Sequence, residues 1–415
     1  MATDRPRALV SGASVAGPVL AYWLERFGYV PTVVERTPEV RMGTGGHAVD
    51  LFGPAVELMD WMGLEGQVES ARTVTRVFSF IRPGRPPVDV SAETASEGVS
   101  SRHVEIMRGD LARILHEAAR HRVEYVFDDS VAAVHDAGPR VEVTFERSAA
   151  REFDVVVGAD GLHSTTRRLV FGPEAEFLRF LGGYLAVFTA PDHLRLGDRM
   201  VAFSAPGRTA AMYPVRETGQ ARVVLLWRTP VPHDVARHDV DAQRGLIRSR
   251  YGDLGWELPR LLAALDQADD LYLDSISQVV MDSWVRGRVG LVGDAGYSPG
   301  PAVGGGTSLA VIGAYMLATE LASAGDPVRA LDRYQQAMRP VVAHSRNIGP
   351  TVMKFLVPRS AAQIWLTAQA MRVLPHVPDP LRRRLTSFGG SAAAMLREAR
   401  LRRPEEVPLA RPSPS

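Results

Sequence analysis

The residues best suited to chemistry lie in three glycine-rich turns, of which the first reads Gly12-Ala13-Ser14-Val15-Ala16-Gly17. Backbone amides at a helix N-terminus approach a pyrophosphate closely only where no side chain intervenes, and glycine supplies that space. Ser14 replaces the middle glycine of the G-x-G-x-x-G pattern, and its small hydroxyl can hydrogen-bond to phosphate. Glu35 follows 18 residues after Gly17, where a carboxylate can accept hydrogen bonds from both hydroxyls of an adenosine ribose. The pattern predicts a dinucleotide with an unphosphorylated ribose, such as FAD or NAD; the alternative is a turn of this shape without a ligand.

The other two turns each follow a continuous apolar run. The second turn, Gly158-Ala159-Asp160-Gly161, follows residues 153–158, and the third, Gly293-Asp294-Ala295-Gly296, follows residues 289–292. A carboxylate at a strand end can hold a polyol hydroxyl, and a glycine-rich helix start can hold an anionic or electron-rich edge. Each turn alone is a common strand-to-helix connection, but the three in this order predict one site assembled from distant segments.

The hydrophobic pattern supplies the elements that would position these turns. Short apolar runs at residues 7–10 and 30–35 flank a helical pattern at 15–27, which predicts a β–α–β unit and a parallel sheet. Alternating runs at 125–127, 131–134 and 141–145 favour an antiparallel meander. Further β-like runs between residues 184 and 227 predict a separate antiparallel sheet, which residues 271–280 rejoin. Helices are expected at 107–120, 306–322, 328–338 and 361–374.

The expected fold class is mixed α/β, with a Rossmann-like parallel-sheet domain interleaved with an antiparallel-sheet domain and followed by C-terminal helices. The expected boundaries follow from the positions of the turns. Residues 1–74, 106–176 and 274–345 form the nucleotide domain, residues 75–105 and 177–273 the substrate domain, 346–400 a helical segment and 401–415 a flexible tail.

Composition narrows the class of protein. The chain has 415 residues, is 46% hydrophobic and has no cysteine, so it can bury a large core but cannot form disulfides or thiolate metal sites. A net charge of +1 provides no general attraction for nucleic acid. No uninterrupted apolar run reaches the roughly 18 residues of a membrane span, and no metal-binding motif occurs, so we expect a cytoplasmic protein without metal. The sequence leaves monomer and homodimer open.

The three turns resemble those of the FAD-dependent aromatic hydroxylases and monooxygenases, typified by para-hydroxybenzoate hydroxylase. They are most similar to the tetracycline-degrading and polyketide-tailoring branch. Two further stretches extend the resemblance, which covers roughly residues 8–321. Met107-Arg108-Gly109-Asp110-Leu111 is similar to the family's R-x-x-L helix start, and Gly45-Gly46-His47-Ala48-Val49-Asp50-Leu51 resembles a flavin-proximal loop. The sequence departs from the family at Ser14 and at Tyr297, where many relatives carry histidine.

The resemblance implies a role for each matching residue. At the adenosine end of FAD, it places Gly12, Ala13, Ser14, Ala16 and Gly17 at the pyrophosphate, and Glu35 and Arg36 at the ribose. At the flavin end, it places Asp50 and Arg108 at the flavin or ribityl chain, Asp294 at the ribityl or pyrophosphate part, and Gly304, Gly305 and Gly306 at the pyrimidine edge of the flavin. It places Asp160 near FAD and NAD(P)H, and Arg41 at NADPH.

The implied reaction is a monooxygenation. NADPH, or NADH, reduces FAD, O₂ adds to give a C4a-hydroperoxyflavin, and one oxygen passes to an aromatic or polycyclic small molecule. His47 is the candidate base, with a structural role as the alternative. The candidate substrate contacts are Phe203, Met212, Tyr213, Trp227 and Pro299, each of which could instead be ordinary sheet core. An FAD-dependent reductase or oxidase of the same fold is the alternative function, and a non-catalytic binding protein is a third.

Overall fold

A six-stranded sheet carries the first, second and third turns at the ends of its strands. The computed structural model describes residues 5–40, 46–96, 102–136, 138–216, 218–301, 304–378, 382, 396 and 399–408. The strand order is β17-β18-β11-β1-β2-β7, and all neighbours are parallel except β17 and β18. The strands are β1 (Arg7–Ser11), β2 (Val30–Glu35), β7 (Glu124–Phe127), β11 (Val155–Gly158), β17 (Val285–Arg286) and β18 (Val289–Leu291). The predicted β–α–β unit is confirmed, with α1 (Ala16–Arg26) between β1 and β2.

The expected meander is partly wrong. β7 pairs in parallel with β2 at the edge of the six-stranded sheet, whereas β8 (Val131–Asp136), β9 (Val141–Phe145) and β10 (Arg151–Phe153) form a separate antiparallel sheet. A parallel strand at the edge of a sheet has one solvent-exposed face, so its apolar and polar residues alternate as they do in an antiparallel strand. The sequence pattern alone therefore could not distinguish a parallel edge strand from a strand of an antiparallel meander.

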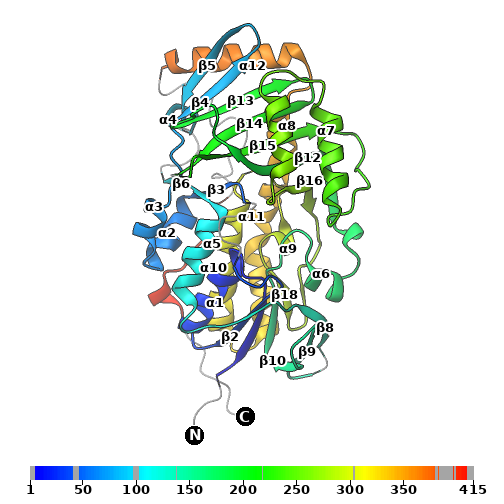
Figure 1. Cartoon of the computed structure of the whole chain (residues 1–415). Coiled ribbons are helices and arrows are strands. Elements are labelled where there is room, and N and C mark those ends of the chain that lie inside the picture. The colour runs from blue at the N-terminus through cyan, green and yellow to red at the C-terminus, as the bar shows by residue number, and fades with distance from the viewer. Residues whose placement is uncertain are drawn as a thin grey trace.

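A seven-stranded sheet lies above the first in Figure 1. Its order is β16-β12-β15-β14-β13-β4-β5, antiparallel except where β4 runs parallel to β13. The strands are β4 (Val77–Arg82), β5 (Arg85–Ser91), β12 (Leu178–Pro191), β13 (Arg199–Ala205), β14 (Arg208–Val215), β15 (Gln220–Arg228) and β16 (Tyr272–Val279). The expected return of residues 271–280 to this sheet is confirmed by the pairing of β16 with β12.

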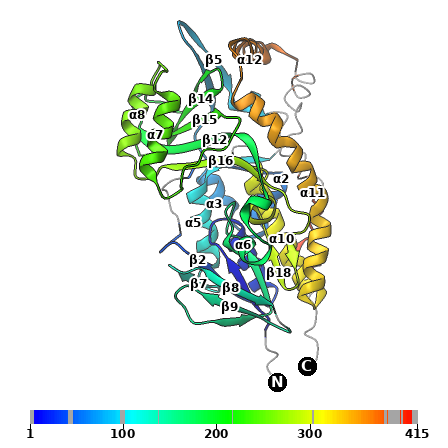
Figure 2. The same ribbon diagram turned by 90° about the vertical axis from the view of Figure 1, so that its right-hand side faces the viewer.

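The two faces of the seven-stranded sheet have different neighbours. One face packs against α7 (Val240–Tyr251) and α8 (Leu258–Gln267), which were not among the predicted elements. The opposite face packs against the end of α11 (Pro327–Leu356), which Figure 2 shows running along one side of both sheets. The helix expected at 328–338 is thus the first part of a longer one. The second face is the one turned toward the six-stranded sheet.

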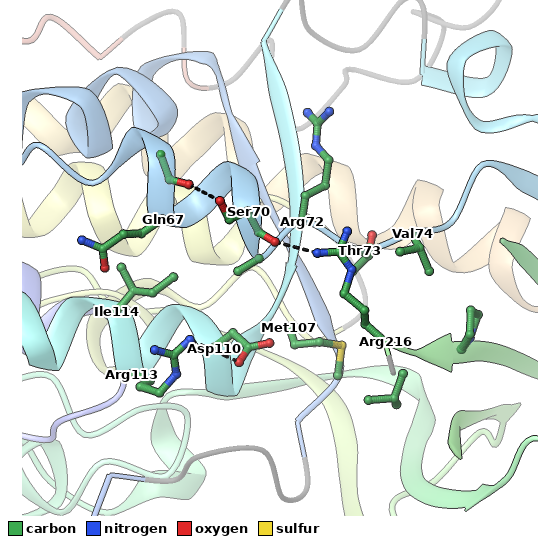
Figure 3. A pocket seen from close by; sticks show the side chains of 14 residues that line it. Gln67, Ser70, Arg72, Thr73, Val74, Met107, Asp110, Arg113, Ile114 and Arg216 are labelled. Atoms are coloured by element: carbon green, nitrogen blue, oxygen red, sulfur yellow. Dashed lines mark hydrogen bonds and ion pairs between the residues drawn. The ribbon is translucent and has the colours of Figure 1, made fainter. Parts of the chain in front are cut away.

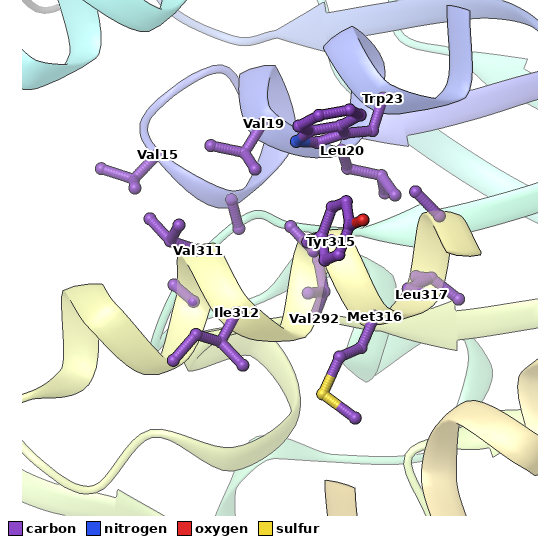
Figure 4. Packing of buried hydrophobic residues seen from close by; sticks show 14 of the residues in the cluster. Val15, Val19, Leu20, Trp23, Val292, Val311, Ile312, Tyr315, Met316 and Leu317 are labelled. Carbon is purple, nitrogen blue, oxygen red and sulfur yellow. The ribbon is translucent and has the colours of Figure 1, made fainter. Parts of the chain in front are cut away.

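The core beside the three turns is built by α1 and α10 (Gly306–Ala324). Figure 4 shows Val19 and Trp23 of α1 pointing toward Val311 and Tyr315 of α10, and the Trp23 and Tyr315 ring centroids are 4.9 Å apart. Burying each such side chain contributes about 1.5–3 kcal/mol. α10 is long and apolar enough to cross a membrane, but 78% of its apolar window is buried inside the structure, as in a core helix. This packing fixes the starts of both helices at the site.

Shorter elements complete the surroundings of the site. β3 (Ala48–Phe52) and β6 (His103–Met107) form an antiparallel pair. The helices nearby are α2 (Gly53–Trp61), α3 (Glu65–Ser70), α5 (Arg108–Ala119), α6 (Thr165–Val170) and α9 (Asp294–Tyr297), and α12 (Ala361–Val373) lies against β5.

Candidate functional site

The first turn has room only for glycine at its two ends. Gly12 has a φ of +109°, and a Cβ there would lie 2.6 Å from the Ala159 carbonyl oxygen. A Cβ on Gly17 would lie 1.8 Å from the Gly12 carbonyl oxygen. Both glycines therefore let the start of α1 fold back closely on the end of β1, which leaves the backbone amides of the turn accessible.

The three turns meet in space. The contact of Gly12 with Ala159 joins the first turn to the second. A Cβ on Gly293 would lie 3.4 Å from the Cβ of Ala16 and 3.1 Å from the Cβ of Ala310, so the third turn touches the starts of both α1 and α10. The predicted convergence of three distant segments is therefore present in the fold.

Two long helices begin at this meeting point without a side-chain cap. Val15 precedes α1 and Gly305 precedes α10, and neither forms a side-chain hydrogen bond to its helix start. The first amides of a helix need acceptors, and they attract negative charge through the helix dipole. Gly304 and Gly305 have φ values of +83° and +75°, a conformation that favours glycine. The arrangement fits the pyrophosphate and the electron-rich flavin edge of FAD.

Glu35 lies at the end of β2 beside the first turn. Its carboxylate accepts a hydrogen bond of 2.9 Å from the Ala13 amide and one of 3.1 Å from the Thr37 amide. These bonds hold both oxygens in a fixed orientation at the partly exposed strand end. The remaining lone pairs can accept hydrogen bonds from ribose hydroxyls, while the side chain of Arg36 is exposed.

Arg108 connects the start of α5 to the first turn. Its Nε and Nη2 atoms donate to Ser14 Oγ over 3.2 and 3.0 Å. A Cβ on Gly46 would lie 3.4 Å from the Arg108 Cβ, so the flavin-proximal loop packs directly on this arginine. The serine that departs from the glycine pattern thus holds a cation at the phosphate-binding turn, where a positive charge favours an anionic ligand.

Asp50 and Asp294 both lie near the start of α10. His103 Nε2 is 2.8 Å from Asp50 Oδ1, and the Asp50 carbonyl accepts a hydrogen bond from Ser308 near the start of α10. A Cβ on Gly306 would lie 3.9 Å from Asp294 Oδ1, which places this carboxylate beside the same helix start. Within the described part of the chain, the Asp294 carboxylate has no hydrogen-bond or ion-pair partner, so it is available to a ligand hydroxyl.

His47 is poorly suited to the predicted role of base. Burial and the neighbouring Arg108 guanidinium lower the pKa of its imidazole to about 4. The ring is therefore uncharged at neutral pH and binds a proton only weakly. The next residue, Ala48, donates its amide to Tyr213 Oη over 2.9 Å, which ties the flavin-proximal loop to β14. A structural role of His47 in this loop agrees better with its surroundings.

Asp160 lies beside Gly12, and its carboxylate is held by hydrogen bonds within the second turn. Its carboxylate accepts hydrogen bonds from the Ser164 hydroxyl, from the Thr166 amide over 2.9 Å and from the Thr166 hydroxyl over 3.0 Å. Ser164 itself caps α6 by accepting from the Arg167 amide. These bonds show that the carboxylate stabilises the start of α6, and its predicted nearness to FAD and NAD(P)H stays a prediction.

This assignment separates Asp160 from Asp294 in a simple experiment. Asp160→Ala should lower the free energy of unfolding by about 1–2 kcal/mol, because the capping residue Ser164 and the Thr166 amide lose their acceptor, and it should change FAD affinity little. Asp294→Ala should weaken FAD affinity and leave the free energy of unfolding nearly unchanged. Urea unfolding and FAD titration of both variants measure this contrast, and equal losses of affinity would contradict it.

Arg167 braces the second turn against the third. Its side chain is fully buried, and its guanidinium donates to the Ala295 carbonyl over 2.9 Å and to the Leu162 carbonyl over 2.7 Å. It also lies 3.3 Å from a carboxylate oxygen of Glu174. The motif-based predictions did not include Arg167. Its contact with Ala295 holds the backbone next to Asp294 in place.

Three predicted substrate contacts belong to the core on the far face of the seven-stranded sheet. Phe203 stacks on Trp256 with centroids 5.4 Å apart, and Trp227 meets Tyr251 edge-on at 6.1 Å. Met212 is fully buried in the same cluster. The prediction that Phe203, Met212 and Trp227 contact the substrate is corrected: they pack against α7 and α8.

Side chains alternate between the two faces of a strand, so the neighbours of these core residues point to the face of the seven-stranded sheet opposite α7 and α8. Tyr213 neighbours Met212 and therefore points toward the flavin-proximal loop, as its contact with Ala48 shows. Cross-strand pairing aligns Tyr272, Val187, Val224 and Ala211 in a row on this face. Three of them, Val187, Val224 and Tyr272, also pack with the end of α11. The sequence did not single out this row, because strand register and the positions of α7 and α8 decide which face is covered.

The structure places Pro299 and Tyr297, two further residues that the sequence analysis named, but it does not describe Arg41. Pro299 lies beside the start of α10, since a Cβ on Gly306 would be 3.6 Å from its ring. Tyr297 is fully buried, and its hydroxyl is 2.7 Å from that of Tyr334. A Cβ on Gly313 would lie 2.1 Å from the Tyr297 hydroxyl, so this glycine makes room for the residue that replaces histidine. Arg41 lies outside the described residues.

A solvent-facing cavity of about 480 Å³ opens between α3, α5 and the end of β14 (Figure 3). Met107 and Asp110 line it on either side of Arg108 in the sequence, and Arg216 reaches across to the Ser70 carbonyl. The cavity includes neither Glu35 nor the three turns, so it is a neighbour of the dinucleotide site.

Comparison with known proteins agrees with this geometry. Residues 6–346 match the family model described as FAD binding domain. A flavin-dependent monooxygenase of Legionella longbeachae is 35% identical over 361 residues, covering 85% of this chain and 90% of the relative. An uncharacterized protein of Mycobacterium tuberculosis is 45% identical over 321 residues, covering 77% and 85%. The crystal structure of the tetracycline destructase Tet(55) superimposes with a TM-score of 0.79 at 32% identity, covering 94% of this chain and 98% of that one.

Proposed function

Because the chain belongs to the family of FAD-dependent aromatic hydroxylases and is an FAD-dependent monooxygenase, we propose that it oxygenates a planar polycyclic molecule held between its two sheets. The observation that carries the proposal is the convergence of Gly12, Ala16, Gly293 and Ala310 at the starts of α1 and α10. This convergence creates one dinucleotide site facing the seven-stranded sheet.

The three turns divide the binding of FAD among them. The amides of residues 12–17 bind the pyrophosphate, with Arg108 adding a positive charge through Ser14. Glu35 accepts hydrogen bonds from the adenosine ribose, and Asp294 accepts one from the ribityl chain. The start of α10 at residues 304–306 supports the pyrimidine edge of the flavin. When bound, FAD supplies electron transfer from NAD(P)H and activation of O₂.

The face of the seven-stranded sheet opposite α7 and α8 orients the substrate. Tyr272, Val187, Val224 and Ala211 form a cross-strand row on this face, and the end of α11 packs against part of it at Val187 and Val224. Such a surface suits a planar, largely apolar ring system, and the sheet excludes water from the reacting atoms. Tyr213 and Pro299 border the same space from β14 and from the start of α10. Similarity to a tetracycline destructase supports a polycycle of this kind, with a role in antibiotic resistance or biosynthesis.

Isotope labelling tests the proposed reaction. Purified holoenzyme is incubated with NADPH, ¹⁸O₂ and a panel of hydroxylated polycycles that includes tetracycline and 1,2-dihydroxyanthraquinone, and the products are analysed by mass spectrometry. We expect one ¹⁸O atom per product molecule and one NADPH oxidised per turnover. Product that forms without the label, or that forms equally well without oxygen, would show that the reaction is a reduction or oxidation of another type.

A further inference from the structure

A chain of hydrogen-bonded titratable groups runs from the substrate face to the surface. The Tyr272 hydroxyl donates to Asp274 Oδ2 over 3.1 Å, and His163 Nε2 lies 2.7 Å from the same oxygen. His163 Nδ1 lies 3.0 Å from Glu174 Oε2. Side-chain exposure rises along the chain from 8% at Asp274 to 17% at His163 and 29% at Glu174. None of these four groups is among the residues assigned above to FAD.

We propose that Tyr272, Asp274, His163 and Glu174 conduct a proton between a hydroxyl group of the bound substrate and the solvent. In this proposal Tyr272 is the catalytic residue, because it is the end of the path that would meet the substrate hydroxyl, and the other three act through it. The inference rests on the proposed function, because it requires a hydroxylated substrate on the inner face of the seven-stranded sheet.

Tyr272 is placed at the reaction site by two independent features. Its position in the row with Val187 and Val224 puts it on the face opposite α7 and α8, where its ring also packs with the end of α11. The charges of Arg108 and Asp294, two residues that border the proposed flavin site, both influence the pKa of the Tyr272 hydroxyl group. Burial raises the pKa of the Tyr272 phenol far above its usual value, so this residue stays protonated and can accept a proton only by passing its own to Asp274.

The transfer balances without a redox partner. The O–H bond of the substrate breaks as its proton moves to Tyr272 Oη, while the Tyr272 proton moves to Asp274 Oδ2. Neutral His163 then takes that proton at Nε2 and releases the proton on Nδ1 to Glu174, which exchanges with solvent. Return of a proton along the same path resets the imidazole when the product is reprotonated.

The protonation state of His163 decides whether a proton can move along this path. Burial alone would lower its pKa, but hydrogen bonds with Asp274 and Glu174 raise the pKa overall above 6.5, against the opposing charge of Arg237. The groups that face it are Asp274 from β16, Glu174 and Arg167 from the segment around α6, and Arg237 from the loop after β15. Below this pKa both ring nitrogens carry protons and Nε2 cannot accept another, so deprotonation of the substrate should slow as the pH falls.

A coloured phenol provides the direct test. 1,2-Dihydroxyanthraquinone is a planar tricycle whose visible spectrum changes when its hydroxyl ionises, so a stopped-flow pH jump on holoenzyme with bound dye measures the rate of proton loss. We expect Tyr272→Phe to slow this rate by roughly 100-fold. His163→Gln should slow it similarly and abolish its dependence on pH near neutrality. Tyr22→Phe, which removes a hydroxyl bonded to the Met62 carbonyl, is the matched control and should have no effect.

Each failure has its own meaning. Unchanged rates and an unchanged pH profile in both variants would overturn the proton path while leaving the monooxygenase proposal intact. Failure of the dye to bind the holoenzyme would count against a polycycle site on this face, and so against the proposed function as well. Because Tyr272→Phe preserves shape and FAD content, a purely structural role of the cluster would leave its rate unaltered.

Discussion

Replacement of Gly17 by alanine is expected to weaken FAD binding by at least about 100-fold, equivalent to roughly 2.7 kcal/mol. The new Cβ would lie 1.8 Å from the Gly12 carbonyl oxygen, so the first turn would have to open by more than an ångström. That movement takes the turn amides away from the pyrophosphate and pushes the Gly12 peptide into its place. The variant should purify nearly colourless, and titration of apoprotein with FAD measures the lost affinity.

Gly66→Ala is the matched control for this variant. Gly66 lies in α3, and a Cβ there would meet nothing within 4 Å, so the same chemical change is made without a clash. It should remain yellow with wild-type affinity. A Gly17→Ala protein that binds FAD as tightly as the control would show that the first turn does not hold the pyrophosphate.

Replacement of Arg167 by methionine is expected to lower the free energy of unfolding by about 3–5 kcal/mol. The buried guanidinium satisfies the carbonyls of Leu162 and Ala295, which would lose this donor, and it faces the Glu174 carboxylate, which would keep His163 and Arg237 as partners. Loss of the bond to Ala295 also frees the backbone beside Asp294, so FAD affinity should fall together with stability. Chemical denaturation of the apoprotein and FAD titration measure the two effects.

Arg168→Met provides the comparison, because Arg168 is the next residue of α6 and its side chain is exposed. Its free energy of unfolding should change by less than about 0.5 kcal/mol. Similar small changes in both variants would mean that Arg167 does not brace the second and third turns.

The features that sequence predicted best are those with a local steric cause. Gly12 and Gly17 are required by contacts within a few residues or with the adjacent strand, and the β–α–β pattern around them is strongly periodic. The order of the three turns predicted their convergence, since the carboxyl ends of parallel strands meet at one edge of a sheet. Glu35 and Asp294 lie at this edge, where the motifs predicted them.

The roles that sequence could not predict depend on tertiary contacts. Asp160 has the same motif position whether its carboxylate faces a ligand or caps α6, and only the structure shows its bonds with Ser164 and Thr166. Phe203 and Tyr213 are both apolar-patterned strand residues, yet α7 and α8 cover the face of Phe203, whereas Tyr213 on the other face contacts the loop at Ala48. The helix cap Asp239 is a local signal that could have revealed α7.

A crystal structure of the yellow holoenzyme tests the central claim most directly. The account predicts one FAD molecule with its pyrophosphate against the amides of residues 12–17, its ribose on Glu35 and its isoalloxazine ring between residues 304–306 and the inner face of the seven-stranded sheet. A flavin bound elsewhere, for example in the cavity beside Arg113, or a ring separated from that sheet face by intervening chain, would contradict it.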